Sequence, residues 1–484
     1  MDLAGASREQ LLAVLAQRDV ELSELRQALS VAHGRIEVLV ERVAGLSARA
    51  GRDSSNSSRP PSSDPPYAPK RGMRGKSGRK PGKQPGAPGS TLSGVDDPDE
   101  VVVCELANCP DCGSSLAAAP IVGVCRRQVF DPPPPPVRPH VTEYQIVTRR
   151  CGCGRQAVGV GPAEASAPAS YGPGTAALAV YLGAGQYLPV KRASSVLARL
   201  AGVHVSTGWL AAQRARAARL IEAQFLPHIR ALLAQVGVLH VDETPGRVAG
   251  KLRYVHVACT EFLTAMHVGD RSAATIDAGG ILPEFDGVLM RDGYAGYTHL
   301  VRAVHAWCGA HLVRDLHGVY DAEPERQLWA AAMADTLLAA NADAQAARAA
   351  GRAAIAPAKL AAIENHYRGA AGKGIADNEH RPGRLGRDAH RLARRFAEHE
   401  PTILRFASDL ATPFTNNEAE RTVRPVKVQQ RASGGAWRTL DGLADFAIVA
   451  SYLSTANKWG KDSLDVLQQL FTSGAWLPAT AAPT

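Results

Sequence analysis

Apolar residues near the start of the chain recur with a seven-residue period. One series consists of Leu15, Leu22, Leu29, Ile36 and Val43. A second series, offset by four and three residues, consists of Leu11, Arg18, Leu25, Ala32, Leu39 and Leu46. Two interleaved series form an apolar seam, which predicts one long helix over residues 8–48 that pairs with a partner helix in a coiled coil. The alternative is an amphipathic helix that packs on its own globular body.

From residue 237 the pattern changes to short apolar runs that are typical of strands. The runs VGVLHVD, LRYVHVACT and TAMHVGD predict three successive strands, with a turn at Pro245 and Gly246 after the first. SAATIDAGGIL is helix-like, GVLMRDG predicts a fourth strand, and LVRAVHAW predicts a fifth that leads into a helix beginning near Cys308. A three-strand meander followed by a helix and further strands indicates a mixed sheet flanked by helices.

Two other regions have helical patterns. Residues 172–236 contain two helices around a Gly-centred turn, with Ser206 or Thr207 opening the second, as in a helix-turn-helix. Because ordinary helical domains share this pattern, DNA reading and simple packing both stay open. Residues 322–410 form an alanine-rich helical insertion, whose basic stretch EHRPGRLGRDAHRLARRF is either a solvated face or a DNA-facing one.

Composition narrows the class of protein. The 484 residues correspond to roughly three domains, and the 45% hydrophobic and 21% charged content excludes a wholly disordered or collagen-like chain. The net charge of +9 favours polyanionic partners. Eight cysteines are too few for a disulfide scaffold, and MDLAGASREQ lacks the apolar core of a signal peptide. We therefore expect a cytoplasmic protein with no membrane partner.

The segment after the predicted coil is polar and then strongly basic. RDSSNSSRPPSSDPPYAPK is too poor in apolar residues to pack, which predicts a linker. The following Gly/Pro-rich stretch contains no acid among its cations, which are Lys70, Arg71, Arg74, Lys76, Arg79, Lys80 and Lys83. An extended chain of this kind can follow a phosphate backbone, which predicts DNA contact. The alternative is a solubilising tether.

Two cysteine pairs lie between residues 100 and 157. Cys109 and Cys112 flank Pro-Asp and precede a glycine, and Cys151 and Cys153 follow about 38 residues later. Four thiolates in two close pairs suit a structural Zn²⁺ site. The second pair is spaced by one residue instead of two, so Cys104 or Cys125 could substitute as a ligand, and a degenerate finger without metal is the alternative.

Acidic residues follow the predicted strands of the sheet. Asp242 and Asp292 each come after an apolar run, and two carboxylates at equivalent strand ends favour a shared metal site. Thr415, Asn416 or Asn417 can cap a later helix that contains Glu420. The basic residues on the same helical face as Glu420 are Arg424, Lys427 and Arg431. This face could hold metal at one end and phosphates along the rest, or form an ordinary row of ion pairs.

Four ordered motifs carry a resemblance to a known family. VDET, DGYAGY, the CGAH element from Cys308 to His311 with Arg314, and NNEAER together resemble the transposases of the insertion sequence 66 family. The leucine-rich coil, NSSRPPSSD linker, basic stretch and cysteine finger upstream also fit. Val313, where the family commonly has Arg, and Gly309, where it often has Trp, depart from the pattern.

The resemblance implies a multidomain α+β protein with a ribonuclease-H-like catalytic core. It assigns an Asp-Asp-Glu triad to Asp242, Asp292 and Glu420. Such a triad would hold two Mg²⁺ or Mn²⁺ ions, about 3.5–4 Å apart, for phosphoryl transfer. We expect water to free a 3′-hydroxyl at the end of the element, and that hydroxyl to attack target DNA. His311 and Arg314 either position DNA and steady charge, or pack on a helix.

The expected partners are double-stranded DNA at terminal inverted repeats and target sites, a second copy of the chain through the coil, and accessory proteins of the same element. A non-catalytic DNA-binding relative and a nuclease on the same fold are the alternatives. The expected regions are a coil at 1–50, linker and basic stretch at 51–99, zinc-finger-like unit at 100–157, helical region at 170–236, catalytic domain at 237–455 and helical tail at 456–484.

Overall fold

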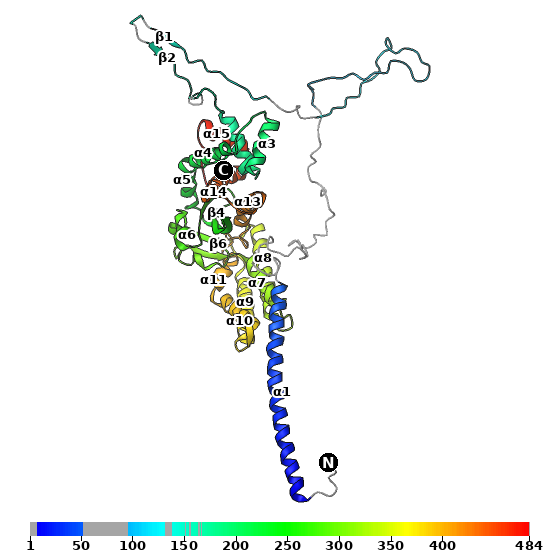
Figure 1. The fold of residues 1–484 in the computed structure, drawn as a ribbon, viewed down its shortest axis with the longest axis vertical. Helices are drawn as coiled ribbons and strands as arrows, with labels where there is room; N and C mark the ends of the chain where they lie inside the picture. Colours follow the sequence, from blue (N-terminus) through cyan, green and yellow to red (C-terminus); the bar gives the residue numbers. More distant parts are fainter. Residues whose placement is uncertain are drawn as a thin grey trace.

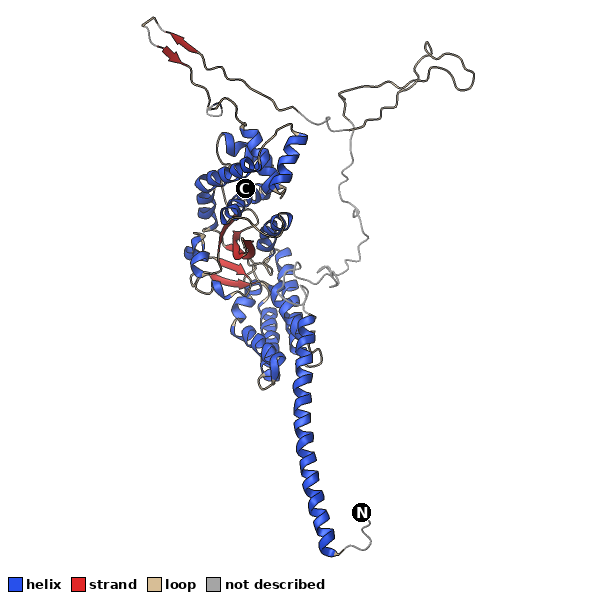
Figure 2. Cartoon of the chain, in the orientation of Figure 1, coloured by secondary structure: helices blue, strands red, loops and turns tan. Residues whose placement is uncertain are grey.

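The protein has an α-helical and β-stranded body from which a long helix and two thin arms extend (Figure 1). The computed structural model describes residues 7–51, 95–130, 138–150, 152–153, 156–162, 165 and 167–483. The strands of the main sheet lie inside the body and are surrounded by helices (Figure 2). The predicted mixed α+β fold is therefore confirmed.

One mixed sheet forms the centre of the body. Its strands are β3 (Val238–Val248), β4 (Lys251–Cys259), β5 (Thr264–Gly269), β6 (Val288–Arg291) and β7 (Val304–Trp307). The spatial order is β5-β4-β3-β6-β7, with β3 antiparallel to β4, β4 antiparallel to β5, and β6 and β7 parallel to β3. All five strands predicted from apolar runs are confirmed.

The turn predicted at Pro245 and Gly246 is wrong. β3 runs through both residues to Val248, and the hairpin turns at Ala249 and Gly250, which both have positive φ. Pairing of β3 with β6 ends at His240, so the other edge of β3 is free of a strand from there on. The Pro245 carbonyl points to that free edge, where it accepts a hydrogen bond from Lys427. Because the amide and carbonyl of one strand residue point to the same side, the amide that proline lacks would not have bonded to β4.

Helices before and after the sheet in the chain share its hydrophobic core. They are α2 (Pro173–Val180), which continues into the π-helical turn Tyr181–Gly185, α4 (Thr207–Gln224), α5 (Leu226–Leu233), α14 (Leu440–Lys458) and α15 (Ser463–Thr472). α14 contacts both β5 and α4, and α15 contacts α2. The C-terminal tail and most of the helical region expected from the sequence thus share one core with the sheet, whereas α3 (Val190–Leu200) buries its apolar residues in a small separate cluster with Leu210 of α4.

The two helices predicted around a Gly-centred turn are α3 and α4. Gly202 adopts a positive φ between the two helices, and the Ser206 side chain caps α4 by accepting a hydrogen bond from the Trp209 amide. α4 buries Ala217 and Ile221 against the body and contacts α14. This helix therefore has a packing role, and its reading of DNA stays a prediction.

The remaining connections within the sheet region are short. They are α6 (Ala273–Ala278) and the 3-10 turns Leu282–Glu284 and Ala295–Tyr297. The Ser272 side chain caps α6 by accepting a hydrogen bond from the Thr275 amide. The helix-like pattern of SAATIDAGGIL is thus confirmed over its first half.

The predicted helical insertion forms a second hydrophobic core beside β7. Its helices are α8 (Leu328–Ala349), α9 (Pro357–Asn378), α10 (Gly383–Glu398), α11 (Glu400–Ile403) and α12 (Arg405–Ser408). Trp329, Tyr367 and Phe396 are buried at its centre. The helix predicted to begin near Cys308 is confirmed as α7 (Gly309–Tyr320), which packs on α8. The arginines of α10 pair with acids: Arg391 with Asp388, for example. Most of the arginines on α10 thus have acidic partners within the chain, and DNA contact by this stretch stays a prediction.

The helix predicted near the N-terminus is confirmed as α1 (Arg8–Ala50). It extends away from the body, and its seam is exposed: Leu15 is 61% accessible and Leu29 is 63% accessible. The seam does not pack on the body of its own chain, so the predicted coiled coil still requires a partner helix. Among the described residues, no helix has both the length and the apolar character required to span a membrane.

Candidate functional site

Parallel strands β3 and β6 bring the two predicted aspartates to the same level of the sheet. His240 on β3 pairs with Met290 on β6, and two residues further along each chain stand Asp242 and Asp292. Asp242 lies within β3, because that strand continues along β4, whereas Asp292 directly follows β6. Strand register thus aligns residues that are 50 positions apart in the sequence.

Asp242 is a half-buried carboxyl near other carboxyls. Burial raises its pKa well above the ordinary value, and the neighbouring charges of Glu243, Asp292 and Glu420 raise it further. The Glu243 backbone amide donates to Asp242 Oδ1 at 2.8 Å, which opposes part of this effect. Of the three acids assigned by the family resemblance, Asp292 and Glu420 thus both lie close enough to Asp242 for their charges to act on it.

Helix α13 (Asn417–Ala432) delivers Glu420 to this pocket. Asn416 occupies its N-cap position, but the side chain does not cap the helix. Instead, Asn416 Nδ2 donates to the Val241 carbonyl at 2.8 Å and Oδ1 lies 2.9 Å from His240 Nδ1. Asn416 thereby fixes the start of α13 to β3, beside Asp242. Pro425 lies inside α13 without ending it.

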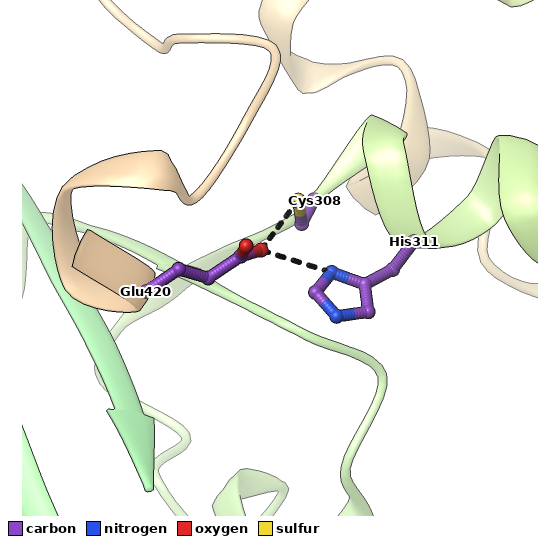
Figure 3. Close-up of side chains that lie close together, drawn as sticks. All are labelled: Cys308, His311 and Glu420. Atoms are coloured by element: carbon purple, nitrogen blue, oxygen red, sulfur yellow. Dashed lines mark hydrogen bonds and ion pairs between the residues drawn. The ribbon is translucent and has the colours of Figure 1, made fainter. Parts of the chain in front are cut away.

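Glu420 meets two residues from the start of α7 (Figure 3). Its Oε1 lies 3.4 Å from His311 Nδ1 and 4.0 Å from Cys308 Sγ. One ligand atom from each of the three residues lies within 4.8 Å of the others. Burial, followed by the charge of Arg314, lowers the pKa of His311, whereas burial raises the pKa of Cys308 to about 11. Glu418 faces elsewhere and pairs with Arg421.

The predicted DNA-contact residues near the pocket have different environments. Arg314 is buried, and its Nε donates to the Ala310 carbonyl at 3.2 Å. The Lys427 ammonium already donates a hydrogen bond to the Pro245 carbonyl. Arg424 and Arg431 are exposed on α13. The burial of Arg314 favours the packing role, and only the two exposed arginines offer free surface to a polyanion. The basic stretch from Lys70 to Lys83 lies outside the described residues.

The first cysteine pair forms a local turn on one of the arms. Gly113 adopts a positive φ, and its amide donates to the Cys109 carbonyl at 2.9 Å. Hydrogen bonds with Ser114, and then with Cys109, lower the pKa of the Cys112 thiol to about 7. The turn thus brings the Cys109 and Cys112 side chains within hydrogen-bonding reach of each other.

The second cysteine pair belongs to a hairpin of β1 (Thr148–Arg150) and β2 (Gln156–Val158) on the other arm (Figure 1). Cys151 lies outside the described residues. Among the residues that are described, Cys153 does not join Cys109 and Cys112 in a three-ligand group. The zinc site therefore stays a prediction.

Comparison with known families identifies the body. The family described as Transposase IS66 family matches residues 168–444, more than half of the chain. The chain belongs to this family. Its matched segment contains β3, β6 and α13, and hence all three acids. A family of unknown function (DUF6444) matches residues 12–93, which include most of α1 and the basic stretch. No curated protein matches the chain.

The structure explains one departure of this transposase-family chain from the expected motif. A Cβ at Gly309 would lie 2.1 Å from the Phe414 ring, and the Gly309 amide donates to the Phe414 carbonyl at 2.8 Å. The aromatic ring that approaches residue 309 comes from residue 414, so no larger side chain fits there. Val313, the other departure, packs against the core of the helical insertion.

Sequence reasoning missed a network beside the acids. Glu243 accepts hydrogen bonds from Tyr297, at 2.8 Å, and from Arg271, whose guanidinium lies 3.7 Å from the Tyr294 ring centroid. Burial and the charge of Asp292 raise the pKa of Glu243, and Arg271 opposes them. The VDET motif includes Glu243, but no local pattern indicates that Arg271, 28 residues later, is its partner.

The acidic pocket has the chemistry of a site for a hard divalent cation. Asp242, Asp292 and Glu420 offer carboxylate oxygens, the ligands that Mg²⁺ and Mn²⁺ prefer. Burial is the main cause of the raised pKa of Asp242, and repulsion from neighbouring negative charges adds to it; a bound cation would offset that repulsion. Transposases usually need a divalent metal, and these residues offer suitable ligands. Among the described residues, however, the three carboxyls do not form a group whose ligand atoms all lie within 4.8 Å of one another, so their metal site stays a prediction.

Proposed function

We propose that the protein is a DNA transposase that cleaves DNA at the ends of an insertion element and joins it to target DNA. In this proposal the sheet is a ribonuclease-H-like core, and Asp242, Asp292 and Glu420 are its catalytic triad. The observation that carries the proposal is the parallel register of β3 and β6, which sets Asp242 and Asp292 at the same level of the sheet, with Glu420 on α13 close enough for its charge to act on Asp242. Membership of the transposase family gives the reaction class.

The three acids would hold two divalent cations. When bound, these ions would activate the attacking hydroxyl and stabilise the leaving oxygen of an in-line phosphoryl transfer. The chain's own residues prepare the pocket for this chemistry. The Glu243 amide orients Asp242, the Tyr294 amide donates to Asp292 Oδ1 at 2.9 Å, and Asn416 fixes the start of the helix that carries Glu420.

DNA binding in the proposal extends beyond the pocket. Arg424 and Arg431 lie exposed on the helix that carries Glu420, so phosphates could follow α13 away from the acids. The basic stretch from Lys70 to Lys83 would add contacts that are independent of sequence, and a zinc finger built on Cys109 and Cys112 would brace that region. The exposed seam of α1 would pair two copies, each bringing one element end.

A strand-joining assay tests this proposal. Purified full-length protein is incubated with Mg²⁺, a labelled terminal-repeat duplex and target plasmid. We expect joined product, and we expect Asp242→Asn to reduce it at least a thousandfold while DNA binding is retained. Asp286→Asn is the matched control, because Asp286 is an exposed aspartate in the loop before β6. Its product yield should stay within twofold of the parent protein.

The same assay separates the alternative functions. Cleaved but unjoined duplex would indicate a nuclease, and a shifted but intact duplex would indicate a DNA-binding protein without catalysis. Strand joining by Asp242→Asn would contradict the assignment of the triad. Retention of full joining by Glu420→Gln would contradict the contribution of α13 in the same way.

A further inference from the structure

Cys308, His311 and Glu420 form a close group that includes a thiol and an imidazole, and the proposed transposition chemistry does not use the thiol (Figure 3). Hard cations such as Mg²⁺ are bound through oxygen, so a buried thiol beside the triad glutamate has no role toward them. His311 Nδ1 is buried and has no hydrogen-bond partner, although it lies 3.4 Å from Glu420 Oε1. A buried ring nitrogen that makes no hydrogen bond but lies beside a carboxylate is a candidate ligand atom for a metal ion shared by the two.

The spacing of these three atoms suits a tetrahedral metal ion. In a zinc site with ordinary bond lengths, neighbouring ligand atoms lie about 3.3–3.7 Å apart. The nitrogen–oxygen distance of 3.4 Å falls within this range, and the sulfur–oxygen distance of 4.0 Å is slightly longer. All three atoms lie within 4.8 Å of one another. Small side-chain rotations would therefore complete the three-ligand geometry, with water as a fourth ligand.

Contacts within the fold hold these ligands in place without an ion. The Asn416 backbone amide donates to Cys308 Sγ at 3.2 Å, an arrangement that also stabilises a metal-bound thiolate. Asn416 begins the helix of Glu420, while Cys308 begins the helix of His311. One hydrogen bond thus joins the two helix starts that supply all three ligands.

The donor set selects a different class of ion from that expected for the acidic pocket. Thiolate and imidazole favour Zn²⁺ and similar thiophilic ions over Mg²⁺. Coordination would release the Cys308 thiol proton to solvent and would leave sulfur, nitrogen and oxygen bound to the ion. Glu420 belongs both to this group and to the acidic pocket. It therefore cannot coordinate a Zn²⁺ ion here and a Mg²⁺ ion in the acidic pocket fully at the same time.

We propose that Cys308, His311 and Glu420 form an inhibitory site for Zn²⁺, which on binding withdraws Glu420 from the acidic pocket. The binding part stands on the geometry of the three side chains alone. The inhibitory part rests on the proposed transposase function, because it assumes that Glu420 is catalytic.

Cobalt substitution tests the binding part. Full-length protein with Cys109→Ser and Cys112→Ser, which weaken the predicted finger, is titrated with Co²⁺ and its absorption is recorded. We expect a sulfur-to-cobalt charge-transfer band and the intense visible bands of tetrahedral cobalt, and we expect Zn²⁺ to remove them. Cys308→Ser in this background should abolish that signal, and His311→Ala should weaken Co²⁺ binding at least tenfold.

A second buried cysteine provides the control. Cys259 is fully buried in the core of the sheet and belongs to no three-ligand group among the described residues. Cys259→Ala should therefore keep the cobalt spectrum, which separates loss of a ligand from general damage to the fold. An unchanged cobalt spectrum in Cys308→Ser would overturn the site.

Zinc inhibition tests the consequence. DNA cleavage in constant Mg²⁺ is measured against rising Zn²⁺ for the parent protein and for Cys308→Ser, each relative to its own zinc-free rate. We expect the Zn²⁺ concentration for half inhibition to rise at least tenfold in the variant. Equal zinc sensitivity of the parent protein and Cys308→Ser would overturn the inhibitory role. The cobalt spectra would then decide whether the metal site itself exists. Absence of cleavage by the parent protein would instead count against the proposed function.

Discussion

The body and the N-terminal region of this protein differ in where their apolar side chains lie. In the body, large residues such as Phe225, Phe285 and Phe446 are fully buried. In the N-terminal region, the α1 leucines are exposed, and so is Val122 on one arm, at 98%. A long apolar stripe facing water is unfavourable unless another surface covers it. The body thus provides its own core, whereas the N-terminal region leaves its apolar residues exposed in the single chain, and we expect a partner to cover them.

The largest expected effect concerns the exposed seam. Leu22→Asp combined with Leu29→Asp would place charge in the apolar stripe of α1, and we expect self-association to weaken at least a hundredfold. The melting temperature of the body should stay the same, because these leucines are exposed in the single chain. Sedimentation and thermal melting measure the two quantities. A large loss of body stability in this variant would contradict the observation that the α1 seam does not pack on the body.

The next effect concerns the polar link within the body. Asn416→Ala would leave the Val241 carbonyl and His240 without their partner, in a place where Asn416 is only 1% exposed. We expect a loss of about 3 kcal/mol in the free energy of unfolding, measured with denaturant. The exposed neighbour supplies the control: Asn417→Ala should cost less than about 0.5 kcal/mol. Equal costs for the two variants would show that the link is unimportant.

A smaller effect is expected where Gly309 meets Phe414. Gly309→Ala would push a methyl group into the ring, which we expect to cost about 2 kcal/mol of stability. Phe414→Leu should lower the cost of that substitution, because a smaller side chain then faces residue 309. A double-mutant cycle measures the coupling. Additive costs would rule out this steric explanation for glycine at the position.

The smallest expected effect is a pH dependence within the body. Burial and the stacked neighbour His256 lower the pKa of His267 from 6.5 to about 4. Between these values the unfolded chain binds a proton that the folded chain does not, so stability falls as pH falls from 6.5 toward 4. We expect His267 to account for about 1–2 kcal/mol of this loss in the free energy of unfolding. The contribution is limited because its ring is partly exposed to solvent, which screens the effect.

Comparison with His267→Gln isolates that contribution. The variant should show a weaker loss of stability between pH 6.5 and pH 4 than the parent protein, while both retain the contributions of other titrating groups. Denaturant melts at several pH values measure the difference. An identical pH profile would show that His267 is not held neutral by the fold.

Much of the fold could be predicted because its signals are local. The heptads of α1, the Ser206 cap of α4 and the apolar runs of the five strands each depend on residues within one helix turn or one strand. The motifs VDET, DGYAGY and NNEAER indicated the family, which the match over residues 168–444 confirms. Hydrophobic periodicity and short motifs therefore determined the elements and the class of protein.

Only the tertiary structure decided which residues meet. Pro245 can lie inside β3 because α13, and not a strand, covers that edge. Asp242 faces Asp292 because β3 and β6 share a parallel register, and Glu420 reaches Cys308, 112 residues earlier, because Asn416 joins two helix starts. Such contacts depend on how separate elements pack, and no spacing along the chain encodes the distance between their side chains.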